Sequence, residues 1–85
     1  MTFQKTQEWI DRNEAEMYMN SADEDVYSAI HSGAISYNVF MYYMQGQGAY
    51  VTATMWSQTT YDSIKSGAIT EAAFLAMLSV ARTGS

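Results

Sequence analysis

Apolar and polar positions follow helical spacing along most of the chain, and one stretch of the pattern occurs twice. Residues 61–78 repeat the plan of residues 27–44, thirty-four positions earlier, with seven of the eighteen aligned positions identical. Each copy places a glycine, Gly33 or Gly67, between two apolar helical segments, where left-handed backbone ends a helix at little cost. A hydroxyl residue three positions later can cap the next helix. The pattern therefore predicts two tandem helical hairpins.

The N-terminal segment predicts one more helix, which runs to about Asn20. Thr2 can cap it, and Phe3, Ile10 and Met17 recur at intervals of seven, with Trp9 beside them. We expect these residues to form one packing stripe against the hairpins. The run Ser21-Ala-Asp-Glu24 has the spacing of a capping box and predicts the start of the second helix.

Residues 37–45 predict a third helix that is rich in large apolar side chains, and residues 71–82 predict a fifth. Residues 49–56 are ambiguous, because Val51, Ala53 and Met55 alternate with threonines as in a strand, yet Val51 and Met55 also share a helical face. We favour a helix over residues 49–66, since no other segment offers a strand to satisfy the backbone of this one.

Together these elements predict an all-α fold of four or five short helices. We expect one helical domain over residues 1–85, with an acidic helix at 1–20, one hairpin at 21–45 and a second at 49–82. A chain of this length buries only about 60–65% of its unfolded surface, so a partner can supply part of its stability. Cysteine is absent, which excludes disulfides and thiolate chemistry.

Charge changes this picture because it is unevenly distributed. Residues 1–25 carry the whole net charge of −5, whereas residues 26–85 are neutral and contain four charged side chains. Residues 32–61 contain none. Exposed surfaces usually carry more charge than this, so we expect part of the later chain to be covered by another molecule.

Sequence motifs for catalysis, cofactor binding or metal binding are absent. There is no phosphate loop, dinucleotide fingerprint, nucleophile elbow or EF-hand spacing. His31 occupies the last turn of a predicted helix, where a cation interacts favourably with the helix dipole, and Lys65 takes the same place in the second copy. We therefore expect no enzyme, no cofactor and no metal site.

The leading functional hypothesis is a non-enzymatic protein-binding component of a larger assembly, either a virion or an oligomer. Tyrosine, tryptophan and methionine are enriched at the centres of protein interfaces, where charge is depleted. Where the second hairpin has Glu71 and Ala76, the first has Tyr37 and Tyr42, which we therefore expect to face outward. The predicted partner-binding residues are Tyr37, Met41, Tyr42, Tyr43, Tyr50, Met55 and Trp56.

The alternative hypothesis assigns the acidic N-terminal face to an inhibitor of a nucleic-acid-handling complex, in the manner of anti-CRISPR proteins. Carboxylates along a helix can occupy a basic groove built for phosphates, although a simply solvated polar face also explains them. The residues are Glu8, Asp11, Glu14, Glu16, Asp23, Glu24 and Asp25. With only four basic residues we expect no direct nucleic-acid binding.

Polar residues interrupt the uncharged stretch, so no apolar run of about twenty residues is available to span a membrane. Asn38, Gln45, Gln47 and Gln58 are the main interruptions. Together with an N-terminus that lacks a secretory apolar segment, this predicts a location in the cytoplasm or in a virion.

The run from Ile64 to Phe74 resembles the helix-Gly-x-Ile-Thr-helix hairpins of small phage proteins of the XkdX type and of bacterial SHOCT oligomerisation segments. The resemblance covers about twenty residues in each copy and leaves the N-terminal helix unmatched. It implies a small accessory protein, of phage or bacterial origin, that assembles with other chains. It implies no catalytic residues.

Overall fold

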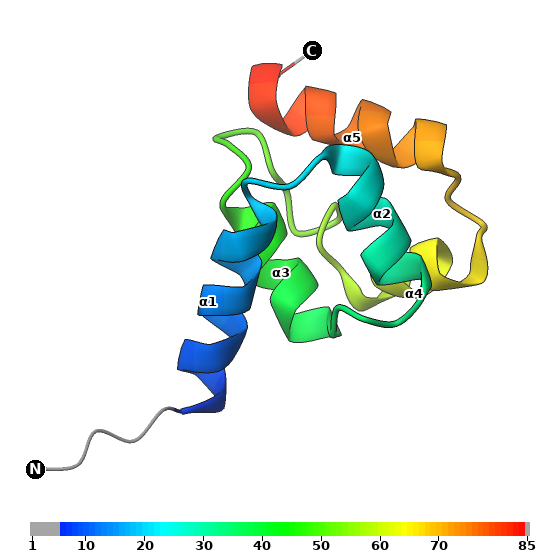
Figure 1. Ribbon diagram of the computed structural model, residues 1–85. Coiled ribbons are helices and arrows are strands. Elements are labelled where there is room, and N and C mark those ends of the chain that lie inside the picture. The colour runs from blue at the N-terminus through cyan, green and yellow to red at the C-terminus, as the bar shows by residue number, and fades with distance from the viewer. Residues whose placement is uncertain (1–5, 85) are drawn as a thin grey trace, which may run out of the picture.

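The computed structural model describes residues 6–84, which form five α-helices and no strand (Figure 1). The predicted all-α class, with short helices, is confirmed. The helices are α1 (Gln7–Tyr18), α2 (Asp23–His31), α3 (Tyr37–Gln45), α4 (Gln58–Ser66) and α5 (Glu71–Thr83). We call α2 and α3 hairpin 1, and α4 and α5 hairpin 2. α1 packs along α3, while α2 contacts both helices of hairpin 2 (Figure 1).

The two hairpin turns use the same backbone hydrogen bonds. Gly33 and Gly67 have φ angles of 85° and 88°, a conformation that glycine adopts without strain. The N–H of Gly33 donates to the carbonyl of Ile30, and that of Gly67 to the carbonyl of Ile64. In each copy the isoleucine two positions after the glycine then donates to a carbonyl six residues upstream. The repeated residues therefore encode one turn, built twice.

The helices that follow the turns start with equivalent caps. The hydroxyl of Ser36 accepts a hydrogen bond from the N–H of Val39, and the hydroxyl of Thr70 accepts one from the N–H of Ala73. Each cap satisfies one of the N–H groups that a helix leaves without a partner at its start. The predicted roles of both hydroxyl residues are confirmed.

A reciprocal pair of tyrosines joins the hairpins. The Tyr27 hydroxyl of hairpin 1 donates to the carbonyl of Ile69 in the turn of hairpin 2, at 2.8 Å. The Tyr61 hydroxyl of hairpin 2 donates to the carbonyl of Ile35 in the turn of hairpin 1. Since each hairpin makes to the other the contact that it receives, the two are related by an approximate two-fold axis.

The same relation holds for the aromatic contacts in the core. The rings of Tyr27 and Phe74 lie 5.8 Å apart at 48°, and those of Tyr61 and Phe40 lie 5.7 Å apart at 45°. Phe40 and Phe74 are both fully buried. Around them the core is completed mainly by aliphatic side chains from the helices of the two hairpins and from the turn of hairpin 1: Val26, Ile30, Ile35, Val39, Met44, Ile64 and Leu78.

Residues 49–56 form turns, so the predicted helix over 49–66 is wrong in its first half. The side chain of Ser57 accepts a hydrogen bond from the N–H of Thr60 and starts α4 there. The Thr60 hydroxyl donates to the carbonyl of Thr54 at 2.7 Å and holds the preceding turn in place. Side-chain bonds to the backbone therefore replace both the helix and the strand that the apolar spacing allows.

The predicted starts of the first two helices also need correction. Thr6 caps α1 by accepting from the N–H of Trp9, and Thr2 lies outside the described residues. α2 begins after Ala22, which makes no side-chain cap, so the predicted capping box at Ser21 is wrong. Three acidic residues in the first turn of α2 still place negative charge at the positive end of the helix dipole.

Candidate functional site

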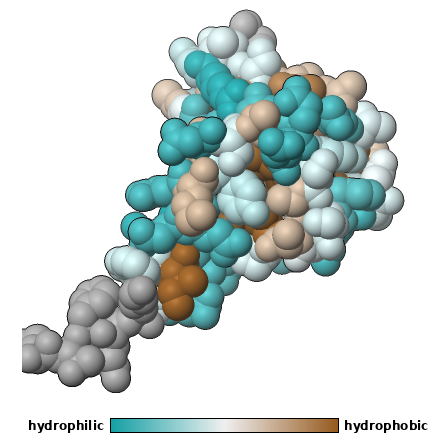
Figure 2. Space-filling view, viewed as in Figure 1, coloured by the Kyte–Doolittle hydropathy of each residue, from teal (hydrophilic) through white to brown (hydrophobic). Residues whose placement is uncertain are grey.

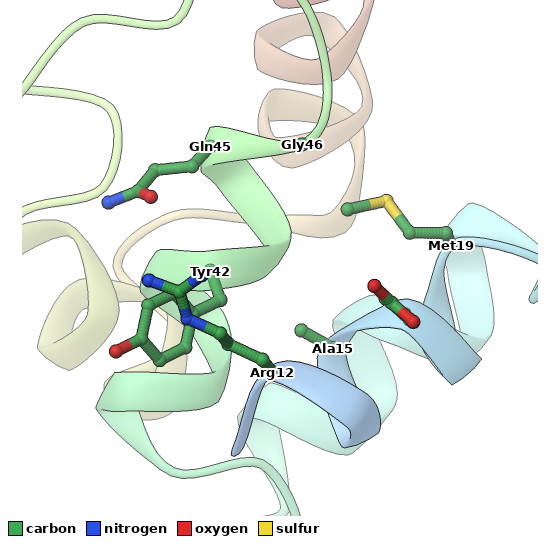
Figure 3. Close-up of a pocket in the computed structure, with 7 residues that line it drawn as sticks. Arg12, Ala15, Met19, Tyr42, Gln45 and Gly46 are labelled. Atoms are coloured by element: carbon green, nitrogen blue, oxygen red, sulfur yellow. The ribbon is translucent and has the colours of Figure 1, made fainter. Parts of the chain in front are cut away.

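A groove of about 240 Å³ lies between α1 and α3, and it is the first candidate site (Figure 3). One wall comes from α1 and the turn after it, and the other from the C-terminal half of α3. Figure 3 shows the Arg12 side chain lying across the ring of Tyr42, and Met19 reaching toward Gly46. The lining residues are Arg12, Ala15, Glu16, Met19, Tyr42, Gln45 and Gly46.

Arg12 is the electrostatic centre of this groove. Its guanidinium carbon lies 4.9 Å from the centre of the Tyr42 ring, and one of its nitrogens is 2.8 Å from a carboxylate oxygen of Glu8. A hydrogen bond to Tyr42 and the negative charge of Glu8 raise the pKa of Arg12 above its usual value. Tyr42 and Glu8 together orient the guanidinium group of Arg12, which stays solvent-exposed.

Gly46 lets α1 and α3 approach at the upper end of the groove. A Cβ atom at this position would lie 2.1 Å from the terminal methyl of Met19. The Met19 sulfur also accepts a hydrogen bond from the side-chain amide of Gln47, at 3.0 Å. Met19 is therefore held over the end of α3 by space that a glycine provides.

The lining of the groove combines polar and apolar groups. It offers a cation, an aromatic face, an amide and an apolar thioether. Its lining includes no serine, cysteine or histidine that a neighbouring base could activate. It is also open to solvent along its length, whereas catalytic sites usually enclose their substrate.

The second candidate is the outer stripe of α1, which we define as Trp9, Ile10 and Met17. These side chains are 40%, 41% and 72% exposed. Figure 2 shows hydrophobic atoms at the N-terminal end of α1, surrounded by hydrophilic ones. The amide of Asn13, which lies between them, turns back to donate to the carbonyl of Trp9. Trp9, Ile10 and Met17 therefore share one exposed face of α1, on which Asn13 lies between the first two and Met17.

Carboxylates border this stripe on both sides. At about 100° per residue, Glu16 projects from α1 on one side of Met17 and Glu14 on the other. Ala15, 2% exposed, points the opposite way and packs against hairpin 1. The stripe is therefore an apolar, acid-edged surface directed away from α3.

The predicted packing role of this stripe is wrong. Ile10 and Met17 are exposed, and Phe3 lies outside the described residues. The inward face of α1 contains Asp11 and Ala15, where Asp11 accepts a hydrogen bond from Gln7 at 2.9 Å. A small residue and a bonded carboxylate allow α1 to lie close to α3, so apolar spacing alone indicated the wrong side.

The predicted Tyr/Met surface is largely part of the body of the protein. Tyr43 is 1% exposed, so its predicted place on the partner-binding surface is wrong. Burial also raises the pKa of Tyr43 to about 12. Tyr50 is 58% exposed and lies against Gly84, at the end of α5. The other predicted residues are half-buried: Tyr37, Met41, Tyr42, Met55 and Trp56.

The comparison between the two hairpins misled this prediction for a physical reason. Tyr42 contacts Arg12 of α1, and Tyr43 lies on the same helix face, whereas the equivalent Ala76 on α5 is exposed. Tyrosine in hairpin 1 fills the space under α1. The sequence did contain a signal for this arrangement, because the larger side chains belong to the face that α1 covers and the smaller ones to the exposed face of α5.

The acidic face is smaller than predicted. Asp11 is 5% exposed, and Glu8 is paired with Arg12. Asp23 receives two hydrogen bonds from Arg82, at 2.8 and 2.9 Å, and these lower the pKa of its carboxyl group. The carboxylates left to form a negative surface are Glu14 and Glu16 on α1, with Glu24 and Asp25 at the start of α2.

His31 contributes to the contact between the hairpins. Its ring stacks on Tyr27 at 5.9 Å, and Nδ1 lies 3.0 Å from the carbonyl of Ile64. Lys65, at the equivalent place in hairpin 2, lies over the ring of Tyr61 at 5.5 Å. Both side chains therefore lie against the tyrosine that their own helix contributes to the hairpin contact.

Residues 6–84 contain no group of three or more histidine, cysteine, aspartate or glutamate side chains placed to hold a metal ion. Within the same residues, every helix is too short or too polar to cross a lipid bilayer.

Comparisons with protein-family models, with curated proteins and with solved structures find no match to this chain.

Proposed function

We propose that the protein is a non-enzymatic protein-binding component that docks through the outer stripe of α1. The observation that carries this proposal is the exposure of Ile10 and Met17, at 41% and 72%, on a helix whose other face is already packed. Large apolar side chains gathered on one exposed face are typical of interaction sites. Side chains at positions i and i+7 of one helix are the anchors by which a helix binds an apolar groove.

The neighbouring groove extends the same surface. Trp9 and Arg12 line a second, shallow hollow together with Thr6 and Glu8, and Arg12 also lines the groove against α3. A partner seated on the outer stripe can therefore reach the Arg12 and Tyr42 pair on one side. Arginine and aromatic residues are enriched among the residues that dominate binding energy.

Affinity capture from the cells that naturally make the chain tests the proposal. The variant Ile10→Glu with Met17→Glu places charge on the outer stripe, where solvent access allows the helix to keep its fold. We expect it to lose the proteins that the wild-type chain retains. Asn38→Glu adds charge at an exposed position of α3 and should retain them. Retention of the same proteins by the double variant would contradict docking through α1.

A second candidate function is inhibition of a nucleic-acid-handling complex through carboxylates. The observation that favours it is the position of Glu14 and Glu16 on either side of the apolar stripe, with Glu24 and Asp25 exposed on α2. A basic groove on the partner complex would then bind both the apolar and the acidic residues. Capture that weakens steeply with salt, and that Glu14→Lys with Glu16→Lys abolishes, would support this function. Capture that persists in high salt and in this variant would contradict it.

A further inference from the structure

The approximate two-fold relation between the hairpins identifies a face of α5 that lacks the cover of its counterpart. We call this face the α5 ridge and define it as Ala73, Ala76, Met77 and Val80. A shift of thirty-four positions relates these residues to a set on α3: Val39, Tyr42, Tyr43 and Gly46. Turns, caps and core contacts all obey this shift, so the two faces occupy equivalent places in the two hairpins.

On α3 this face binds a helix. Tyr42 lies under Arg12, Gly46 lies under Met19, and Val39 and Tyr43 are each 1% exposed. The contact between α1 and α3 therefore shows that the second helix of such a hairpin can bind another helix on its outer face.

On α5 the face is bare. Ala73 and Ala76 are exposed, Met77 is half-buried and Val80 is 40% exposed. The chain that precedes α4 meets the C-terminal end of α5, where Gly48 lies against the backbone of Ala81 and Tyr50 lies against Gly84. The ridge is the part of α5 that this contact leaves open.

We propose that the outer stripe of α1 in one copy packs on the α5 ridge of a second copy. The inference rests on the proposed function for α1 and adds the partner. Shape favours the match, because Trp9, Ile10 and Met17 project as large side chains whereas Ala73 and Ala76 make a shallow surface. Large side chains that project from one helix interdigitate with small residues on the helix that faces it.

Charge favours this pairing over a symmetric contact between two α1 helices. α1 carries Glu14 and Glu16 beside its stripe, so two α1 helices would bring like charges together. α5 carries one acidic residue, Glu71, and one basic residue, Arg82, and residues 26–85 have no net charge. An acid-edged stripe therefore meets less repulsion on α5 than on another α1.

The proposed contact joins two different surfaces, so it is heterologous. A dimer joined in this way keeps one free stripe and one free ridge, so assembly continues until a ring closes or an open chain grows. A small protein that forms such arrays matches the assembly role proposed above.

Cysteine cross-linking tests the pairing directly, because the chain contains no cysteine of its own. Met17→Cys and Ile10→Cys each place a thiol on the stripe, and Ala76→Cys places one on the ridge. We expect a disulfide-linked dimer when a stripe variant is mixed with Ala76→Cys under mild oxidation, and monomers when each is oxidised alone. Asn38→Cys, also at an exposed helical position, should cross-link with none of them.

Every other result overturns the proposed pairing. Dimers of Ala76→Cys alone would show that α5 packs on α5, and dimers of the stripe variants alone would show that α1 packs on α1. Equal cross-linking of Asn38→Cys would show random collision, and no cross-linking of either mixture would show that these faces do not meet.

Sedimentation velocity over a range of concentrations separates this inference from the proposed function. We expect wild-type chain to form oligomers, and Met17→Glu or Ala76→Glu to weaken them by about tenfold or more, as loss of an interface anchor does. Asn38→Glu should leave them unchanged. A strictly monomeric wild type would overturn self-assembly, while the capture experiment would still decide whether α1 binds another protein.

Discussion

Hairpin 1 and hairpin 2 share their turns and caps but differ in what covers them. In both, a glycine with positive φ ends the first helix, a hydroxyl caps the second, and a tyrosine reaches the turn of the other hairpin. On the outer face of the second helix, hairpin 1 has tyrosines beneath α1, whereas hairpin 2 has alanines in solvent. The turn residues therefore specify the hairpin, and the outer residues specify what packs on it.

The largest expected effect on this comparison comes from substitution of the two core phenylalanines, Phe40 and Phe74. Phe40→Ala and Phe74→Ala should each lower the free energy of unfolding by about 3–5 kcal/mol, because both remove a fully buried ring. Urea denaturation of the two variants measures the effect, with the milder Phe→Leu exchanges as a second pair. If only one of the two variants lost unfolding free energy, the two halves of the core would not be equivalent.

The next test removes the hydroxyl groups that connect the hairpins. Tyr61→Phe should cost about 1–3 kcal/mol, because it leaves the buried carbonyl of Ile35 without its donor. Tyr27→Phe should cost less, since Tyr27 is only half-buried and water can replace its hydroxyl. Denaturation curves of both variants check the order. A larger loss for Tyr27→Phe would contradict the burial that the structure assigns to the two contacts.

The turn glycines give a smaller and more equal effect. Gly33→Ala and Gly67→Ala should each cost about 1–2 kcal/mol, because alanine is strained at positive φ. An added Cβ meets no atom within 4 Å at Gly33, and at Gly67 its nearest neighbour is His31 at 3.7 Å, so backbone strain alone sets the cost.

Gly46→Ala supplies the contrast to these two variants. Its φ is −82°, so alanine causes no backbone strain there, but the new methyl must displace Met19. We expect thermal unfolding to change little for Gly46→Ala, while NMR shifts of α1 change.

Unequal losses of unfolding free energy for Gly33→Ala and Gly67→Ala would show that the two turns differ in a way that their hydrogen bonds do not reveal.

The smallest effect concerns the ion pair that joins α2 to α5. Arg82 lowers the pKa of Asp23 below its ordinary value of 3.8, so the pair stabilises the fold at neutral pH and loses this effect as pH falls through the lowered pKa. Asp23→Asn should cost about 0.5–1 kcal/mol at pH 7, since the pair is partly exposed, and nothing once the carboxyl group is protonated.

Denaturation at a series of pH values measures this difference. Asp25→Asn removes a carboxylate from the same helical turn without touching Arg82, and it should show a smaller dependence on pH. If the unfolding free energy of Asp23→Asn still differed from that of the wild type far below pH 3.8, the ion pair would not be the cause of the difference.

The sequence predicted the parts of the fold that depend on local backbone chemistry. The repeat, the turn at Gly33 and Gly67, and the caps at Ser36 and Thr70 follow from residue types at fixed spacing, and the structure confirms them. It did not predict the two-fold contact, because the hydroxyls of Tyr27 and Tyr61 bind carbonyls far away in the chain.

The candidate site was harder to predict because two patterns were misleading. The heptad spacing of Ile10 and Met17 is typical of a core stripe, yet the helix packs through Ala15 instead. Residues 49–56 fit helix and strand equally well, and hydrogen bonds from Ser57 and Thr60 decided between them and a turn. Apolar spacing identifies a face, but what lies opposite decides whether that face is covered.

The central claim is that hairpin 2 exposes the equivalent of a face that hairpin 1 covers with α1, and that this face meets the outer stripe of α1. The most direct measurement follows the amide resonances of the uniformly ¹⁵N-labelled chain as its concentration rises. We expect concerted shifts at Trp9, Ile10 and Met17 and along the α5 ridge, with hairpin 1 unchanged. Spectra that do not change with concentration, or shifts centred on Tyr42 and Tyr50, would contradict the claim.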